Sequence, residues 1–221
     1  MLTKKYISKS LPYLALNDDG NKALDIMDDF MLSELPVIDE NNYLGILQSK
    51  DIFDYNLFEE KMQDIKQKIH HIFINENQHV FDAFKMMNLY NLTLLPVLNS
   101  KDHYIGSITN SGLINNLAQT VTVKEEGFFL MISIEKKDFS LSEISNIIER
   151  NNGKIIGMFI DTINENELMV VYLKVFTQDI DDIIQSLDKF NYDAQIINYQ
   201  ENETNEMYNQ RLDNLLKFIK T

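Results

Sequence analysis

The spacing of apolar residues predicts alternating short strands and amphipathic helices along the first half of the chain. Apolar positions that alternate with polar ones indicate a half-buried strand, and apolar positions three and four residues apart indicate a helix. Pro36 cannot donate a backbone hydrogen bond, so its strand is expected to begin, or to lie at a sheet edge, near this residue. The pattern gives the order strand, helix, strand, turn, strand, helix. The elements are expected at residues 13–16, 22–31, 33–38 and 43–47, with the last helix from about residue 49.

The same order returns about 60 residues later, because this half of the chain contains an internal repeat. Pro36 recurs 60 positions on as Pro96, and Gly45 recurs 61 positions on as Gly106, so one residue is added in the turn between them. Two copies indicate a paired module rather than a solenoid. The second copy is expected to form a strand at residues 72–74, a helix at 80–90, a hairpin at 93–109 and a helix at 110–118, after a charged segment at 59–69.

Beyond residue 120 the pattern changes to strand, helix, strand, strand, helix, strand, which is the order of a ferredoxin-like unit. Ser140 and Glu143 have the spacing of a helix-capping box. A last amphipathic helix is expected at residues 207–219, with Leu212, Leu215, Leu216 and Ile219 on its apolar face. The other elements are expected at residues 128–135, 140–150, 154–163, 168–176 and 194–199, with a helix that begins at residue 177.

Composition and charge narrow the class of protein. The 221 residues are 44% apolar, which is enough for a packed core, and the net charge of −14 opposes contact with nucleic acid and anionic membranes. The absence of Cys excludes disulfides, zinc thiolates and Cys nucleophiles, and it suits a reducing compartment. The apolar runs fall short of the roughly 20 residues that span a bilayer. The N-terminus is a poor signal peptide, so a soluble, cytoplasmic protein is expected.

Both copies of the repeat carry a hydrophobic-Pro-Val-hydrophobic strand, an Asp or Asn turn, and a hydrophobic-Gly-hydrophobic strand that leads into a helix. This pattern resembles a tandem pair of CBS domains over roughly residues 11–120. The resemblance implies an α/β (α+β) fold in which two βαββα repeats form a pseudo-symmetric pair, with two clefts that hold adenine nucleotides in many relatives. The βαββαβ region is similar to an ACT-like domain, a small-ligand sensor and dimerisation module. The order of domains resembles the acetoin-utilisation accessory proteins.

Candidate ligand residues follow from this resemblance. Nucleotide-binding relatives carry Gly-hydrophobic-x-Thr/Ser-x-x-Asp after the hairpin, where Gly allows close backbone approach and the helix start offers N–H groups to a phosphate. The first copy keeps Asp51 but has Gln48 in place of the hydroxyl, and the second keeps Thr109 but has Gly112 in place of the acid. The candidates are Leu35, Pro36, Val37, Gly45, Lys50, Asp51, Leu95, Pro96, Val97, Gly106 and Thr109.

Several of these candidates also have a structural alternative. The spacing of Thr/Ser-x-x-acid at a helix start is that of a capping box, which accounts for Thr109 and Asp51 without any ligand. Lys50 has the character of a solvated surface charge, and Leu35 and Leu95 are typical core residues. In the ACT-like region, the turn at residues 136–140 lacks the Gly that lets an amino acid approach the backbone in relatives, which argues against amino-acid binding.

No pattern for catalysis or a metal site is visible in the sequence. His70 and His71 are adjacent and would point to opposite faces of a strand; there is no P-loop, dinucleotide fingerprint, nucleophile elbow or HExxH motif. The sequence therefore predicts a non-catalytic regulatory protein without a cofactor. Its CBS pair would bind AMP, ADP, ATP or S-adenosylmethionine and shift the conformation of a homodimer that controls a protein partner. The alternative is an interaction and dimerisation scaffold with degenerate ligand sites. The expected organisation is CBS repeats at residues 1–60 and 61–120, a linker at 121–126, an ACT-like domain at 127–200 and a C-terminal helix at 201–221.

Overall fold

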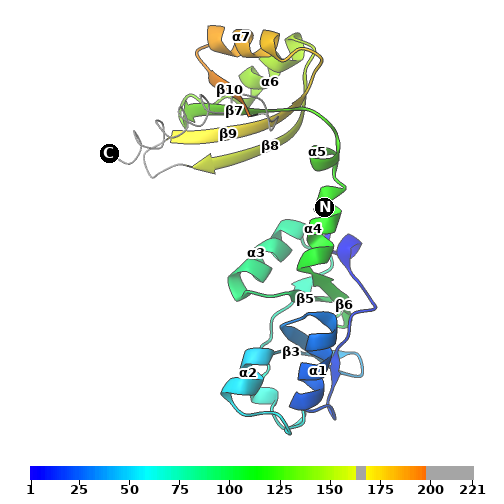
Figure 1. Cartoon of the computed structure of the whole chain (residues 1–221). Coiled ribbons are helices and arrows are strands. Elements are labelled where there is room, and N and C mark those ends of the chain that lie inside the picture. The colour runs from blue at the N-terminus through cyan, green and yellow to red at the C-terminus, as the bar shows by residue number, and fades with distance from the viewer. Residues whose placement is uncertain (163–167, 198–221) are drawn as a thin grey trace, which may run out of the picture. The chain divides into compact units, whose positions relative to one another are not determined.

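The chain forms two compact units, Met1–Thr120 and Val121–Thr221, in a computed structural model that describes residues 1–162 and 168–197 (Figure 1). The helix predicted at residues 207–219 lies outside the described residues. The domain boundaries given above remain predictions.

The first unit contains the βαββα pattern twice, as the internal repeat predicts. The first repeat consists of β1 (Leu14–Ala15), α1 (Gly20–Phe30), β2 (Glu34–Asp39), β3 (Asn42–Gln48) and α2 (Ser49–Asp54). The second consists of β4 (Ile74–Asn75), α3 (Val80–Tyr90), β5 (Leu94–Leu98), β6 (Tyr104–Thr109) and α4 (Asn110–Ala118). The two sheets have the orders β1-β2-β3 and β4-β5-β6, and in each the first pair is parallel and the second antiparallel. The segment between the repeats contains a short 3-10 turn at Lys66–Lys68.

Pro36 lies in the middle strand of its sheet, two residues after the start of β2. The opposite residue, Ile46, turns its backbone N–H and C=O away from β2 and bonds His70, with N···O distances of 2.8 and 2.9 Å. The backbone nitrogen of Pro36 therefore faces β1, and β1 begins to pair only at Val37. The proline removes no ladder hydrogen bond, which explains how it is tolerated in a central strand.

The segment that precedes each repeat pairs with the sheet of the other repeat. Ser8 and Ser107 on β6 form an antiparallel bridge with N···O distances of 2.9 and 3.1 Å, and His70 forms the same bridge with Ile46 on β3. A short 3-10 helix at Thr3–Tyr6 precedes Ser8 and is bonded to the second repeat. We call the segments around Ser8 and His70 the exchanged arms. Because each arm belongs to one repeat by sequence and to the other by pairing, the two repeats are tied together reciprocally.

Gly45 and Gly106 make room for the exchanged arms. Their φ angles are +150° and +136°, which L side chains rarely adopt. A Cβ at Gly45 would lie 2.6 Å from the carbonyl oxygen of His70, and a Cβ at Gly106 would lie 2.7 Å from that of Ser8. The sequence analysis assigned these glycines to the approach of a ligand, whereas the group that approaches them here is the backbone of the chain itself.

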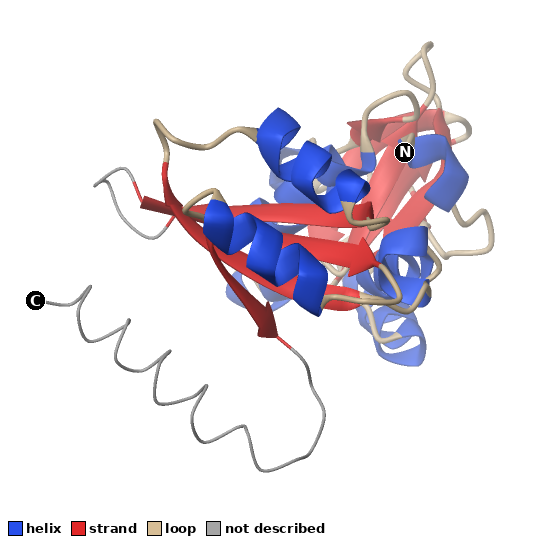
Figure 2. Cartoon of the chain, turned by 90° about the horizontal axis from the view of Figure 1, so that it is seen from above, coloured by secondary structure: helices blue, strands red, loops and turns tan. Residues whose placement is uncertain are grey.

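The second unit has the predicted βαββαβ order. Its elements are β7 (Phe128–Glu135), α6 (Leu141–Arg150), β8 (Lys154–Thr162), β9 (Leu168–Phe176), α7 (Asp181–Lys189) and β10 (Asp193–Ile197). The sheet is antiparallel throughout with the order β10-β7-β9-β8, and α6 and α7 lie on the same face of it (Figure 2). A short helix, α5 (Val121–Lys124), occupies part of the segment predicted as a linker, and α7 begins at Asp181 rather than at residue 177.

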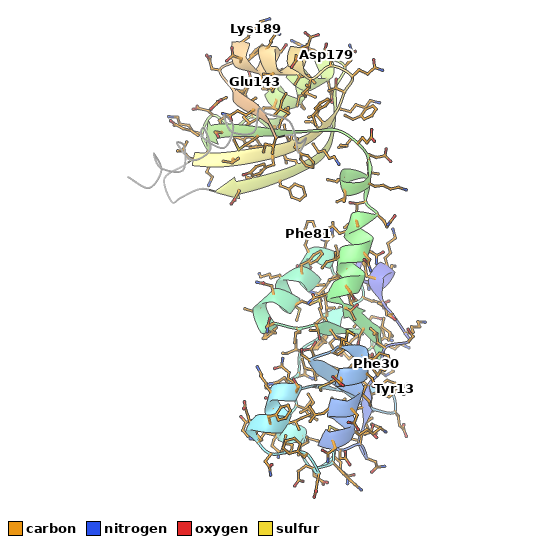
Figure 3. All side chains as sticks on the ribbon, in the orientation of Figure 1. Tyr13, Phe30, Phe81, Glu143, Asp179 and Lys189 are labelled. Atoms are coloured by element: carbon orange, nitrogen blue, oxygen red, sulfur yellow. The ribbon has the colours of Figure 1, made fainter. Side chains whose placement is uncertain are left out.

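The capping box predicted at the start of α6 forms only in part. Ser140 Oγ accepts a hydrogen bond from the backbone N–H of Glu143 at 3.3 Å, as expected. The Glu143 side chain (Figure 3) instead accepts from the Tyr192 hydroxyl at 2.5 Å, which connects α6 to the segment before β10. Burial, and then the bond to Glu143, raises the pKa of Tyr192 to about 12. The Glu143 carboxylate, which the local pattern assigned to the helix start, therefore bonds Tyr192, a residue far away in the sequence.

Candidate functional site

A groove with a volume of about 380 Å³ is lined by residues from both repeats of the first unit. This volume falls within the roughly 300–1,000 Å³ that is usual for small-molecule sites. The hairpins of the two repeats meet beside it, where the Tyr104 backbone N–H donates to the Asn41 carbonyl at 3.4 Å. The lining residues are Lys9, Leu11, Tyr13, Ile38, Glu40, Asn41, Tyr104, Ile105 and Gly106.

The groove combines two aromatic rings with charged and amide groups. Tyr13 (Figure 3) and Tyr104 meet edge to face, with ring centroids 6.2 Å apart. The Tyr104 hydroxyl bonds Ser107 Oγ at 2.9 Å, and burial raises the pKa of Tyr104, so this ring is neutral at physiological pH. Lys9 contributes an exposed cation and Asn41 an amide. Glu40 adds a carboxylate to the same lining, so the groove offers rings to a planar apolar group and one charge of each sign to polar groups.

The corresponding positions of the second cleft are packed with aromatic side chains. Tyr43 precedes Tyr104 by 61 positions and Phe73 follows Tyr13 by 60, so both are repeat equivalents of the groove rings. Tyr43, His71 and Phe73 contact one another with centroid separations of 5.1 to 6.0 Å. The buried Tyr43 hydroxyl donates to the Ile72 carbonyl, and burial raises its pKa. The two clefts therefore differ although their sequences are related.

Asp51 is held by protein groups and is only 5% exposed. Its Oδ2 accepts from His70 Nε2 at 2.9 Å and from the Gln48 backbone N–H at 3.4 Å, and it completes a capping box with Gln48 at the start of α2. Since His70 lies on an exchanged arm, this hydrogen bond also joins the two repeats. Thr109 caps α4 by accepting from the Gly112 N–H at 3.1 Å. The structural alternatives given for Asp51 and Thr109 are thus both observed.

The remaining candidates lie mostly in the packed interior. Leu35 and Val37 are 0% exposed in the core of the first repeat, and Leu95 and Val97 are 0% exposed in the core that contains the second. Pro36 and Pro96 are buried, and Lys50 is exposed on α2. Of the eleven candidates, Gly106 is the one that lines the groove. The repeated aromatic positions, Tyr13 with Phe73 and Tyr43 with Tyr104, were the signal in the sequence that could have located it.

Glu34 is a buried acid at the junction of β2 and β5 that the sequence analysis did not single out. It is 0% exposed, and its Oε1 accepts from the Thr93 backbone N–H at 2.6 Å, from Thr93 Oγ1 at 2.8 Å and from the Leu94 N–H. Among the described residues, Oε2 has no hydrogen-bond partner. Burial raises the pKa of Glu34 despite these three bonds, which favour the charged form. Because the donors belong to the second repeat, Glu34 joins the repeats through their buried strands.

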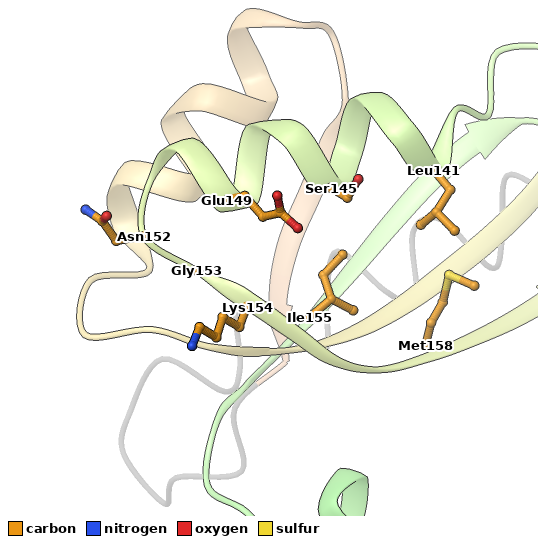
Figure 4. Close-up of a pocket in the computed structure, with 8 residues that line it drawn as sticks. All are labelled: Leu141, Ser145, Glu149, Asn152, Gly153, Lys154, Ile155 and Met158. Atoms are coloured by element: carbon orange, nitrogen blue, oxygen red, sulfur yellow. The ribbon is translucent and has the colours of Figure 1, made fainter.

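A second hollow, of about 830 Å³, lies between α6 and β8 in the second unit (Figure 4). The charged groups at its rim are Glu149 and Lys154, and its apolar wall includes Leu141 and Met158. Residues 136–139, the turn in which relatives carry the ligand-approaching Gly, do not line it. In the described ranges, no helix has the length and apolar character needed to cross a bilayer, and no three His, Asp or Glu side chains converge as metal ligands would.

Comparison with known proteins identifies the first unit. The family model for the CBS domain matches residues 4–57 and 64–119. A CBS domain-containing protein of Dictyostelium discoideum is 28% identical over 136 residues, which cover 55% of this chain and 94% of that protein. A solved CBS domain pair/ACT domain protein of Thermotoga maritima is 18% identical, with a TM-score of 0.46 over 54% of this chain and 98% of the solved one. The solved protein CBSX2, in complex with AMP, is 16% identical, with a TM-score of 0.45 over 53% of this chain and 96% of the solved one. The chain thus contains a tandem pair of CBS domains and belongs to the CBS-domain proteins.

Proposed function

We propose that the first unit is a sensor in which an adenine nucleotide or a related small molecule binds the groove and shifts the conformation of a homodimer that controls a protein partner. The observation that carries this proposal is the composition of the groove, whose walls come from both repeats. CBS domain pairs commonly bind adenine nucleotides in regulatory roles, and the CBSX2 relative was solved with AMP. The second unit would act as the ACT-like dimerisation module of an acetoin-utilisation accessory type of protein.

The proposed mechanism is a population shift. A ligand that contacts Tyr13 from the first repeat and Tyr104 from the second would favour the relative orientation of the repeats in which both contacts are made. The exchanged arms would carry this preference, because each arm precedes one repeat in the sequence and pairs with the sheet of the other. The ligand can change the equilibrium by no more than the difference between its affinities for the two orientations.

Calorimetric titration of the full chain with AMP, ADP, ATP and S-adenosylmethionine tests the proposal. We expect one ligand per chain, because the second cleft is packed by Tyr43, His71 and Phe73. Lys9→Glu should weaken a phosphate-bearing ligand about tenfold, equivalent to about 1.4 kcal/mol. Lys85→Glu is the matched control, since it makes the same charge change at an exposed position of α3 that does not line the groove. Flat heats for all four compounds at millimolar concentration would end the nucleotide proposal.

A scaffold without ligand binding is the second candidate, and the state of Asp51 favours it. The carboxylate that would meet a ribose is occupied by His70 and Gln48. Melting curves of the parent and of Asp51→Ala, with and without each nucleotide, separate the two functions. Stabilisation of the parent that Asp51→Ala loses supports sensing through this carboxylate, and stabilisation that persists in Asp51→Ala supports binding in the groove. If no nucleotide shifts the melting curve of either protein, the result supports the scaffold, for which light scattering should still show a dimer.

A further inference from the structure

The groove of the first unit carries one cation and one anion in its lining. Lys9 and Glu40 are the charged residues among those that line it, and the others are uncharged at neutral pH. Both are exposed. Among the described residues, no ion pair includes either of them. Their charges are therefore available to a molecule that binds in the groove.

The two charges are held at different points along β6. The bridge between Ser8 and β6 holds the next residue, Lys9, beside the middle of that strand. The Asn41 carbonyl accepts from the Tyr104 N–H at 3.4 Å, which holds the preceding residue, Glu40, beside the start of β6. These anchor points are three residues of β6 apart, about 10 Å. A ligand that lies along β6 therefore meets the cation and the anion at different places.

The backbone conformation of Glu40 is unfavourable for this type of residue. Its φ angle of +55° lies in the left-handed region. The other described residues with a positive φ angle are Gly, Asn or Asp, apart from Met31. Asn and Asp tolerate this region because their short polar side chains can bond the nearby backbone. A Glu at this position costs strain that Asn would avoid, so the carboxylate that it brings to the groove points to a function.

The groups that usually hold a polyphosphate are engaged elsewhere in the first unit. A helix N-terminus offers backbone N–H groups to phosphate. At the start of α4, however, the Gly112 N–H donates to Thr109 Oγ1 at 3.1 Å, and none of the residues that line the groove belongs to α4. At the start of α2, Asp51 and Gln48 form a capping box. A chain of phosphates in the groove would therefore meet the carboxylate of Glu40 in place of further donors.

We propose that Lys9 and Glu40 make the groove selective for a ring-bearing ligand whose polar part carries both a positive and a negative charge, and that Glu40 disfavours polyphosphates. The inference rests on the proposed function, because it concerns the ligand of the same groove. The ring of such a ligand lies against Tyr13 and Tyr104. Its anionic group lies near Lys9 and its cationic group near Glu40. Each added phosphate brings another negative charge to a lining with a single cation, in a chain whose net charge is −14.

Calorimetric titration of the full chain with S-adenosylmethionine, which carries both charges, and with ATP tests the proposal. The parent should bind S-adenosylmethionine about tenfold more tightly than ATP, and Glu40→Lys should reverse this order. Glu59→Lys is the matched control, because it makes the same charge change at an exposed position that does not line the groove, and it should preserve the order. Raising the salt concentration should reduce the preference of the parent, because salt screens exposed charges.

Adenosine and a second variant separate a charge effect from a deformed groove. Adenosine has the ring without either charge, so the parent and Glu40→Lys should bind it alike. If Glu40→Lys does not bind adenosine, Glu40→Asn replaces it, because Asn suits the left-handed turn and removes the charge. This variant should lower the preference for S-adenosylmethionine about threefold.

The outcomes distinguish this inference from the proposed function. ATP that binds the parent as tightly as S-adenosylmethionine overturns the inference and leaves the proposed function intact. A preference that persists in Glu40→Asn, or one that Glu59→Lys changes as much as Glu40→Lys does, overturns it as well. If neither S-adenosylmethionine nor any of the nucleotides binds the parent, the proposed function fails and the inference fails with it.

Discussion

Replacing Glu34 with Gln is expected to stabilise the first unit at neutral pH and to have little effect in acid. Gln retains the oxygen that accepts from Thr93 N, Thr93 Oγ1 and Leu94 N, and it carries no charge into a site that is 0% exposed. Its amide nitrogen takes the position of Oε2, which lacks a partner among the described residues. The variant thus resembles the protonated form of Glu34 in shape, in charge and in its accepting oxygen, although its amide carries two N–H donors where the protonated acid carries one O–H.

The sign of the pH dependence follows from the raised pKa of Glu34. Burial moves this pKa above its ordinary value of 4.5, so the folded state holds the proton more tightly than the unfolded state. The stability that this proton provides is complete below pH 4.5 and is lost as the pH rises through the folded-state pKa. Each unit of that rise corresponds to about 1.4 kcal/mol. The advantage of Glu34→Gln should therefore be near zero at pH 4 and reach its full size above the folded-state pKa.

Truncation gives the opposite result. Glu34→Ala leaves the backbone N–H groups of Thr93 and Leu94 buried without an acceptor. Each unpaired donor costs about 1–3 kcal/mol, so a loss of about 2–6 kcal/mol is expected. The net cost should be largest below pH 4.5 and smaller above the folded-state pKa, because there the variant also removes the buried charge.

Hydrogen exchange of the Thr93 and Leu94 amides, followed by NMR between pH 4 and pH 8, reports on this junction in the first unit alone. Glu60→Gln is the control, because it removes the same charge at an exposed position of an acidic protein. If Glu34→Gln gains no protection relative to Glu60→Gln at pH 8, or gains the same amount at both pH values, the account of a buried, destabilising charge is wrong.

Two other substitutions test contacts between residues that are far apart in the sequence. Gly106→Ala should lower the free energy of unfolding by about 1–3 kcal/mol, because Ala is strained at this φ angle and its Cβ would clash with the Ser8 carbonyl. Loss of hydrogen-exchange protection at the Ser8 amide would show that the arm has detached. Full protection there would contradict the steric argument. Tyr192→Phe should cost about 1 kcal/mol of stability at pH 8 by removing the bond to Glu143. Because the pKa of Tyr192 is raised to about 12, the parent should also lose stability between pH 10 and 12, and Tyr192→Phe should not. If the stability of parent and variant changes in parallel over this pH range, Tyr192 does not stabilise the fold through its bond to Glu143.

Local periodicity predicted most of the elements because it reflects burial of one side of each helix or strand. Helices α3 and α4 and strands β7 and β9 have the bounds expected from the sequence. The predicted Pro-containing strands are also present, at the centre of their sheets. Pro36 and Pro96 are tolerated there because β1 and β4 begin to pair only at the residue after each proline. Where β1 and β4 begin is a property of the assembled sheet, which local periodicity does not contain.

The contacts that define the candidate site are long-range, and periodicity contains no information about them. Nothing near His70 in the sequence indicates that its imidazole bonds Asp51, or that its backbone pairs with Ile46. The repeated glycines were recognised correctly as places of close backbone approach. A sequence shows the room at Gly106 but not which segment lies against it, and here the Ser8 backbone does.

The length of the exchanged arms accounts for the difference between the two clefts. Ser8 and His70 make equivalent bridges, and Tyr13 and Phe73 occupy equivalent repeat positions. The arm from Ser8 to Tyr13 is two residues longer than the arm from His70 to Phe73. The shorter arm brings His71 and Phe73 against Tyr43, whereas the longer arm lines the groove with Lys9 and Leu11.

Deleting Lys9 and Ser10 should therefore convert the open groove into a copy of the packed cleft. We expect the deletion to abolish the calorimetric binding of any nucleotide that the parent binds, and to preserve the protected amides of the bridge between Ser8 and Ser107. The double substitution Lys9→Gly with Ser10→Gly keeps the length of the arm and should weaken binding only by the loss of the lysine charge. A deletion variant that binds as well as this control would show that arm length does not determine which cleft is open, and the asymmetry would then have to arise from the aromatic residues themselves.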